Sequence, residues 1–357
     1  MKIYHSLGYS IFVCIFLMAC VKDRPHPDPI VFANLQHRGI VILNEGSLGN
    51  ANAEISYLDF QTAVVSQNLY HQTNQQLLGD VAQCILSLND GYVISLNNSG
   101  KLIFVDSQFK WIRTIAPLMF PRQILQTDAG HIYLSTLYKP YIYVINTQTY
   151  SLEKTIVTPY LNTENMLKMG SSVWLCHWDT ACHSIYKINT LTHSIVDSIP
   201  INGRAPQYIC QDKQGMVWVL SGNKYKGKVS MLTRFNPNNK QILNSLSFDS
   251  EQDPFRLQIN KGGDTLWFLQ VNYNGTALHN GLYCMPIEAN ELPSSPFIPA
   301  QTGSYFWSFG IDPTTNHIYL SDPKGFTQNS TISEYNAEGL LLHQYQAGIG
   351  ANSFIFR

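Results

Sequence analysis

One repeat recurs through almost the whole chain and constrains the fold more than any other feature. Seven segments share a pattern in which a turn precedes an apolar run, often with an aromatic residue second. The segments are GIVILNE at 39, GYVISLN at 91, HIYLSTL at 131, SVWLCHW at 172, MVWVLSG at 216, TLWFLQV at 265 and HIYLSDP at 317. Their first apolar residues lie 40 to 52 residues apart. A period of about 40 to 50 residues is typical of β-propellers, in which each repeat is one blade.

Each repeat also contains further strand-like runs around the shared segment. A second run follows and ends in Asp or Asn at a turn, where these residues tolerate tight hairpin geometry. These turn residues are Asp59, Asp106, Asn146, Asn189, Asn236 and Asn336, whereas the sixth repeat has Pro286 near that point. One run precedes the shared segment and another follows the second, which gives four strands, A to D. The sequence therefore predicts an all-β fold, a seven-bladed β-propeller with four antiparallel strands per blade.

The two ends of the repeat region complement each other. The first repeat lacks a strand A, because the residues before Arg38 do not resemble a strand, while the chain ends in a spare strand-like piece, GANSFIFR. We expect residues 351–357 to join blade one, which closes the ring and removes two open sheet edges. Residues 38–357 then form one domain. The alternative of two smaller β domains has no Pro-, Gly- or Ser-rich linker to support it.

The N-terminal segment predicts export. Lys2 precedes an apolar stretch from 11 to 18 and the sequence LMAC, which resembles the bacterial lipobox and makes residues 1–19 a signal peptide and Cys20 the lipidated residue. An ordinary secretory signal that happens to contain cysteine is the alternative. Residues 20–37 include VKDRPHPDP and read as a flexible tether. We expect a lipid-anchored protein of the outer membrane, exposed at the cell surface, that touches the membrane only through its lipid.

Five cysteines follow Cys20, and none belongs to a CxxC pair. Cys176 and Cys182 flank a short polar loop and could face each other across a hairpin. Two interpretations stay open, a disulfide between them or two free thiols. The remaining three lie in apolar strand patterns typical of small core residues.

Composition and motifs exclude several classes of function. Lys and Arg total 23 against 24 Asp and Glu, with no basic block, so nucleic-acid binding has no electrostatic support. No GxSxG, Walker A or HExxH motif occurs. His177, Asp179 and His183 lie close together in one hairpin and could bind a transition metal. A solvated polar loop is the favoured interpretation, because no second cluster with ligand spacing supports a metal site. We therefore expect no enzymatic activity, no cofactor and no metal.

The strand order also predicts where a ligand would bind. The B-to-C and D-to-A connections emerge on one face of such a ring, here called the top face, and they carry aromatic residues interleaved with Arg, Asn and Asp. Such a surface suits a bulky, partly apolar ligand, although any single ring could instead pack between blades. The candidate ligand-binding residues are Glu45, Asp80, Arg122, Tyr138, Asn165, Trp178, Tyr225, Phe255, Arg256, Tyr305 and Trp307. The blade-six loop adds Tyr273 to the aromatic residues of this face.

Three stretches resemble a known family. Residues 41–62 (VILNEGSLGNANAEISYLDFQT), LGDVAQ at 78–83 and the final blade from 311 resemble the YncE-like propeller lipoproteins of Bacteroidetes, and among them the BtuG type. The resemblance covers the mature chain in architecture, with its strongest matches in the first and last blades. It implies capture of cobalamin or a related corrinoid on the top face and transfer to a TonB-dependent outer-membrane receptor. It also implies a protein that is monomeric on its own.

Two other functions remain open at this point. A lactonase-like hydrolase would hold a divalent ion near the axis, where Glu45, Asn165 and Asp80 could supply oxygen ligands. A propeller used for protein interaction or adhesion would instead have a shallow top face without a pocket.

Overall fold

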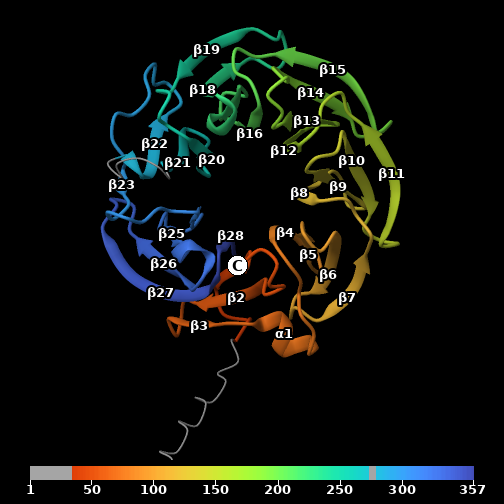
Figure 1. Cartoon of the computed structure of the whole chain (residues 1–357), viewed down its shortest axis with the longest axis vertical. Helices are drawn as coiled ribbons and strands as arrows, with labels where there is room; N and C mark the ends of the chain where they lie inside the picture. Colours follow the sequence, from red (N-terminus) through yellow and green to blue (C-terminus); the bar gives the residue numbers. More distant parts are fainter. Residues whose placement is uncertain (1–33, 273–278) are drawn as a thin grey trace, which may run out of the picture. The chain divides into compact units, whose positions relative to one another are not determined.

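The computed structural model describes residues 34–272 and 279–357. These residues form seven four-stranded antiparallel sheets arranged as blades around a central axis (Figure 1). The predicted seven-bladed β-propeller is thus confirmed. The expected signal peptide, Cys20, most of the tether and Tyr273 lie outside the described residues.

The four strands of each blade run from the axis outward, in the order A, B, C and D. From blade one to blade seven, the A strands are β28 (Ala351–Phe356), β4 (Ala82–Leu88), β8 (Pro121–Gln126), β12 (Thr163–Met169), β16 (Pro206–Gln211), β20 (Pro254–Ile259) and β24 (Ser308–Ile311). The B strands are β1 (Gly39–Asn44), β5 (Gly91–Leu96), β9 (His131–Thr136), β13 (Ser172–His177), β17 (Val217–Asn223), β21 (Thr265–Gln270) and β25 (Ile318–Asp322).

The outer strands follow the same order. The C strands are β2 (Glu54–Asp59), β6 (Lys101–Asp106), β10 (Tyr141–Asn146), β14 (Ser184–Asn189), β18 (Lys228–Phe235), β22 (Gly281–Pro286) and β26 (Asn329–Tyr335). The D strands are β3 (Val64–Ser66), β7 (Trp111–Ile115), β11 (Ser151–Val157), β15 (Ser194–Pro200), β19 (Ile242–Ser247), β23 (Ile298–Pro299) and β27 (Leu341–Ile349).

The last strand of the chain closes the ring, as the sequence predicts. β28 pairs antiparallel with β1, with Ile40 opposite Phe356 and Leu43 opposite Ser353. Figure 1 shows this blue strand against the red and orange strands of blade one. Closure leaves no unpaired inner strand in blade one, so the two ends of the domain stabilise each other.

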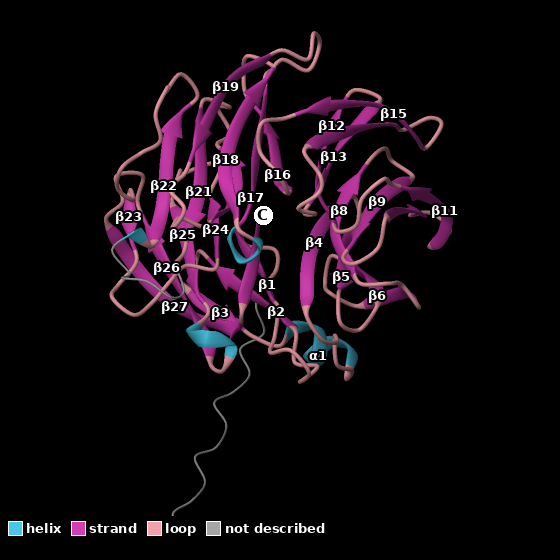
Figure 2. Ribbon diagram, turned by 45° about the horizontal axis from the view of Figure 1, so that its top comes forward, coloured by secondary structure: helices cyan, strands magenta, loops and turns pink. Residues whose placement is uncertain are grey.

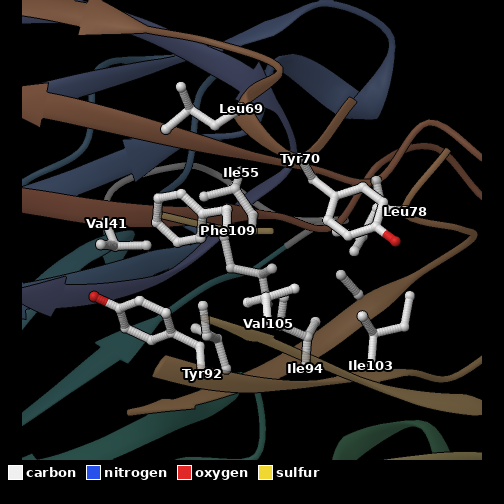
Figure 3. Close-up of a cluster of buried hydrophobic side chains, with 14 of the residues drawn as sticks. Val41, Ile55, Leu69, Tyr70, Leu78, Tyr92, Ile94, Ile103, Val105 and Phe109 are labelled. Atoms are coloured by element: carbon white, nitrogen blue, oxygen red, sulfur yellow. The ribbon is translucent and has the colours of Figure 1, made fainter. Parts of the chain in front are cut away.

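Packing between blades explains why the B and C strands read as continuous apolar runs. Successive side chains of a strand point to opposite faces of its sheet, and here both faces are covered by a neighbouring blade. In β1, Ile40 and Ile42 contact blade seven, whereas Val41 and Leu43 contact blade two. The described residues contain one buried apolar cluster at each of the seven blade interfaces. Figure 3 shows the cluster between blades one and two.

The Asp and Asn residues that end the C strands close the turns with their side chains. The Asn146 Oδ1 accepts hydrogen bonds from the amides of Gln148 and Thr149, both at 2.9 Å, and Asp59 bonds two following amides in the same way. These are Asx turns, in which a side-chain oxygen satisfies turn amides that the sheet cannot reach.

Two local features differ from the sequence prediction. The fourth run of blade one gives only three strand residues and then a short helix, α1 (Leu69–Asn74), which Figure 2 shows beside β2. The buried Glu54 carboxylate draws this segment into a helix by accepting the amides of Tyr70 and His71. The ordered domain also begins before residue 38, because Leu35 packs on the core and His37 bonds Asp59 at 2.8 Å. No helix of the described residues is long and apolar enough to cross a membrane.

The structure has Cys176 and Cys182 as free thiols, both buried. The Cys182 Sγ donates to the Ser184 carbonyl at 3.2 Å. Of the two readings of this hairpin, the structure therefore shows the unbridged one.

Candidate functional site

A β-bulge near the start of the A strand sets the inner surface of six blades. Each bulge places one extra residue opposite the B strand, as where Ala82 pairs with Leu96 and Cys84 with the adjacent Ser95. Bulges re-aim side chains and are frequent beside functional sites. The first residue within each register shift, here called the bulge residue, is polar in all six blades. From blade one to blade six, the bulge residues are Asn352, Gln83, Arg122, Glu164, Gln207 and Arg256.

Hydrogen bonds join five bulge residues into a chain around the axis. The Arg122 guanidinium donates from Nη1 to Gln83 Oε1 at 2.6 Å and from Nη2 to Glu164 Oε1 at 2.9 Å. Arg256 donates to the Asn352 amide oxygen, and Asn352 donates from Nδ2 to the backbone carbonyl of Gln83 at 3.2 Å. The polar floor of the site is therefore built from five different blades and fixed by its own contacts.

The sixth bulge residue, Gln207, is held apart from this chain. Its Nε2 donates to the carbonyl of Gly222 at 2.9 Å, and the Trp178 indole Nε1 donates to the same oxygen at 3.1 Å. Glycine is required there, since φ is +142° and an added Cβ would lie 2.3 Å from the Ser230 hydroxyl. One backbone carbonyl thus positions an aromatic and an amide side chain from neighbouring blades.

Glu45 connects the bulge residues to the aromatic side of the site. It follows β1 at the top face, accepts a hydrogen bond from Gln83 Nε2 at 2.7 Å, and accepts another from the Trp307 indole Nε1 at 3.1 Å. Trp307 is packed further by Phe255, at 5.8 Å between ring centroids, and by the Arg256 guanidinium, 5.6 Å above its ring. Of these five residues, the sequence predicted all but Gln83 as site residues.

Burial shifts the acid–base chemistry of these groups. It raises the pKa of the Glu45 carboxyl, and the charges of Arg256 and Arg122 offset this only in part. It likewise raises the pKa of Glu164 against the effect of Arg122. Burial alone would lower the pKa of Arg122, but the adjacent Glu164 carboxylate leaves it raised, so the guanidinium stays charged.

These residues surround a pocket of about 340 Å³ on the top face. Seven of the predicted residues line it, namely Glu45, Arg122, Trp178, Tyr225, Phe255, Arg256 and Trp307. Together with Tyr208, the rings of the lining come from blades four to seven, whereas blades one to three contribute only polar side chains. All rings of the pocket therefore lie on one side, here called the aromatic half, where polar side chains also occur, whereas the side of blades one to three, the polar half, is polar throughout.

Four predicted residues do not line the pocket. The Asp80 carboxylate accepts the Gly49 amide at 3.0 Å and an Asn98 amide, and so holds two top-face loops together. Tyr138 is exposed and packs edge-on against Phe120. Asn165 accepts the Ile209 amide at 3.3 Å, and Tyr305 is partly buried beside the pocket residues without being one of them.

The pocket also contains residues that the candidate set omitted. They are Gln83, Gln123, Glu164, Gln207, Tyr208, Asn223, Lys224, Asp253 and Val271. Gln83 and Glu164 are bulge residues, and each lies within three positions of a predicted residue. The signal that could have identified them is a polar residue at the same place near the start of successive A strands.

The hairpin considered as a metal site is arranged differently. His177 is fully buried between blades three and four, where its ring contacts those of Tyr160 and Tyr186, while His183 is exposed. Asp179 accepts the Ala181 amide in a turn. Among residues 34–272 and 279–357, no group of three or more His, Cys, Asp or Glu side chains is arranged to hold a metal ion.

The fold and the pocket together define a seven-bladed β-propeller with an axial top-face site. Residues 38–349 match the family described as "Domain of unknown function (DUF5074)", and because this match spans most of the chain, the protein belongs to that family. No curated protein matches the sequence.

Solved structures of low sequence identity share the fold. A quinonprotein alcohol dehydrogenase-like protein from Bacteroides thetaiotaomicron is 13% identical over 90% of this chain and 79% of its own, with a TM-score of 0.69. A functionally unknown protein from Desulfotomaculum acetoxidans is 14% identical over 90% and 98%, with a TM-score of 0.60. Hydrazine synthase from Kuenenia stuttgartiensis is 12% identical over 74% and 86%, with a TM-score of 0.57. At these identities the likeness shows the fold alone.

Proposed function

We propose that this protein is a non-enzymatic ligand-capturing propeller that binds a bulky nutrient in its top-face pocket. The observation that carries the proposal is the division of one pocket into an aromatic half and a hydrogen-bonded polar half. Aromatic faces supply contact area, and fixed polar groups supply orientation, which is the usual construction of a small-molecule site. The contacts that hold Trp307, Trp178 and Arg122 in place favour tight binding, since little ordering is left to occur on association.

The first ligand to test is a corrinoid such as cobalamin. This choice rests on the sequence resemblance to the YncE-like and BtuG-type lipoproteins and on the match between a two-sided pocket and a ligand with both ring and amide groups. A corrinoid is larger than the pocket volume of about 340 Å³, so the pocket would receive one side of the molecule while the top-face loops contact the rest.

The same resemblance supports a role in uptake. We propose that the protein is anchored in the outer membrane by a lipid on Cys20, faces the cell exterior and passes its ligand to a TonB-dependent receptor. Because the aromatic half of the pocket opens on the top face, a receptor would approach the ligand from that side. Support for a non-enzymatic role comes from two pocket carboxylates, Glu45 and Glu164, which are engaged with Gln83, Trp307 and Arg122 rather than directed at one common point.

Calorimetry of the purified protein with cyanocobalamin tests the proposal directly. Tyr225→Ala removes an exposed pocket ring and is expected to weaken binding about tenfold. A tenfold change corresponds to ~1.4 kcal/mol, which is within the range of one aromatic contact. Tyr138→Ala is the matched control, because Tyr138 is also an exposed top-face tyrosine but does not line the pocket, and it should weaken binding less than Tyr225→Ala. Absence of heat and of a melting shift with cyanocobalamin would exclude the corrinoid, and equal effects of both variants would exclude the pocket.

A further inference from the structure

The charged residues that line the pocket cancel one another. Three cations, Arg122, Lys224 and Arg256, stand against three anions, Glu45, Glu164 and Asp253, so the formal charge of the lining is zero. Arg122 pairs with Glu164 at 2.9 Å. Lys224, in the short helical turn η1 (Lys224–Lys226), reaches the carboxylate of Glu251 at 3.4 Å. Arg256 makes no ion pair, but its charge acts on the Glu45 carboxyl, as that of Lys224 acts on Asp253. Each cation of the lining therefore has an acidic side chain near it.

Arg122 is the cation for which this compensation matters most. Its two terminal nitrogens are bonded to Gln83 and Glu164, and its Nε is enclosed without a partner among the described residues. A ligand carboxylate would have to displace Glu164, itself only 5% exposed, or share the guanidinium with it. A neutral acceptor such as an amide or hydroxyl oxygen needs only one remaining N–H and disturbs neither contact.

The opposite half of the pocket holds its rings, beside the charged residues Lys224, Asp253 and Arg256. Trp178, Tyr225, Phe255 and Trp307 form an arc of rings over four consecutive blades. The rings at the two ends of the arc already use their indole N–H groups, toward Gly222 and Glu45 respectively. What they offer to a ligand is therefore their faces and edges, which bind apolar ring surface and add no charge.

We propose that this site selects uncharged ring-bearing ligands, and that Glu164 sets this selectivity by neutralising Arg122. The inference deepens the proposed ligand-capturing function and depends on it. Removing one member of a buried ion pair leaves the other charge uncompensated. Without the Glu164 carboxylate, Arg122 becomes a receptor for anions, and the preference of the pocket changes from neutral to negative ligands.

Two fluorescent probes of one scaffold test this without depending on the natural ligand. N-phenyl-1-naphthylamine is uncharged, and 8-anilinonaphthalene-1-sulfonate adds a sulfonate to the same rings. Energy transfer from the pocket tryptophans to the naphthyl group reports binding. For the wild-type protein we expect the uncharged probe to bind about tenfold more tightly or better, because every cation of the lining has an acidic neighbour and offers the sulfonate little to offset its desolvation. Tyr225→Ala should weaken both probes and Tyr138→Ala neither, which assigns the signal to the pocket.

The variants then isolate the role of charge. Glu164→Gln keeps the side-chain shape and is expected to shift the ratio of the two affinities toward the sulfonate by about tenfold. The double variant Arg122→Gln/Glu164→Gln removes both charges and should return the ratio to that of the wild type. Arg122→Gln alone leaves the Glu164 carboxylate without its cation, so this variant should bind the sulfonate probe even more weakly, relative to the uncharged probe, than the wild type does. This series separates charge from folding, since all three proteins can be compared by their melting temperatures.

Three results would overturn the inference. They are a wild-type preference for the sulfonate, an unchanged ratio in Glu164→Gln, and the absence of binding of either probe. Failure of cyanocobalamin to bind, with the expected probe series intact, would instead refute the corrinoid and leave the charge selectivity standing. Binding of cyanocobalamin together with an unchanged probe-affinity ratio in Glu164→Gln would refute the inference about Glu164 and leave the proposed ligand-capturing function standing.

Discussion

Acidification should destabilise this propeller through one buried histidine, His177. Its side chain is fully buried at the interface of blades three and four, and neither ring nitrogen has a hydrogen-bond partner in the described part of the chain. The rings of Tyr160 and Tyr186 contact it at 6.1 and 5.2 Å between centroids. Burial lowers the pKa of His177 from 6.5 to about 3, so the folded protein keeps this imidazole neutral where the unfolded chain would protonate it.

The sign and size of the effect follow from linkage. Because the pKa in the folded state is the lower one, the unfolded state binds more protons below about pH 6.5, and stability falls as the pH drops through that value. At about pH 5 the unfolded-state pKa lies roughly 1.5 pH units above the solution pH, and each unit is worth ~1.36 kcal/mol. His177 alone should therefore lower the free energy of unfolding by about 2 kcal/mol relative to about pH 8.

His177→Phe isolates this contribution. Phenylalanine keeps a ring between the two tyrosines and removes two buried polar atoms that lack partners, so the variant should be more stable by about 1–3 kcal/mol at about pH 8. The advantage should grow by about 2 kcal/mol at about pH 5, because phenylalanine cannot titrate. Urea unfolding followed by tryptophan fluorescence at the two pH values measures both differences.

The control makes the same chemical change on the surface. His183 lies exposed on the same hairpin, and His183→Phe should alter the pH dependence by less than about 0.5 kcal/mol. If the stability difference between wild type and His177→Phe were the same at both pH values, the imidazole would not be the buried neutral group described above. A less stable variant at about pH 8 would show that His177 has a hydrogen-bond partner after all.

Three further changes test the scaffold. Trp307→Phe removes the 3.1 Å hydrogen bond to Glu45 and should lower the free energy of unfolding by about 1–3 kcal/mol. The indole N–H of Trp267 has no partner among the described residues, so Trp267→Phe should lower that free energy less. Urea titrations of the two variants measure the difference. Glu334→Gln replaces a carboxylate that accepts four hydrogen bonds, from two histidines and two tyrosines. It should lower the free energy of unfolding by about 2–4 kcal/mol in the same assay, and an unchanged urea midpoint would contradict the structural role of Glu334. Deleting 351–357 removes β28 and should abolish cooperative thermal unfolding by circular dichroism; a truncated chain that melts like the full one would refute closure by this strand.

The sequence was sufficient to predict the ring because its strongest signal comes from the most constrained strands. B strands such as Gly91–Leu96 are covered on both faces by neighbouring blades, so nearly every position is apolar and the run is easily recognised. The closing strand was also predictable, because the first repeat lacks an inner strand and an additional strand follows the last repeat. Pairing the two completes blade one. The short helix α1 was not predictable, because it depends on the Glu54 carboxylate, which is distant in sequence.

The candidate site was predicted less completely, and the errors have one physical origin. Placing Asn165 rather than Glu164 at the pocket is an error of one residue, and placing Asp80 rather than Gln83 is an error of three. In a regular strand a shift of one residue reverses the face to which a side chain points. The bulges of the A strands introduce such a shift near the point where each strand meets the axis, and no residue pattern in a single repeat marks its position.

The same bulges place polar side chains around most of the axis. Bulge residues of blades six, one, two, three and four form the hydrogen-bonded polar floor, but in blade five Gln207 bonds the Gly222 carbonyl instead, which also holds Trp178. Blade seven has no register shift in its A strand, and Trp307 precedes that strand and bonds Glu45 instead. Blades five and seven, which add no residue to this chain, present Tyr225 and Trp307 to the pocket, whereas Trp178 and Phe255 come from blades four and six, whose bulge residues belong to it. Ligand selectivity in such a ring can change through the residue at one bulge, because each blade presents that residue independently of the apolar interfaces that hold the fold.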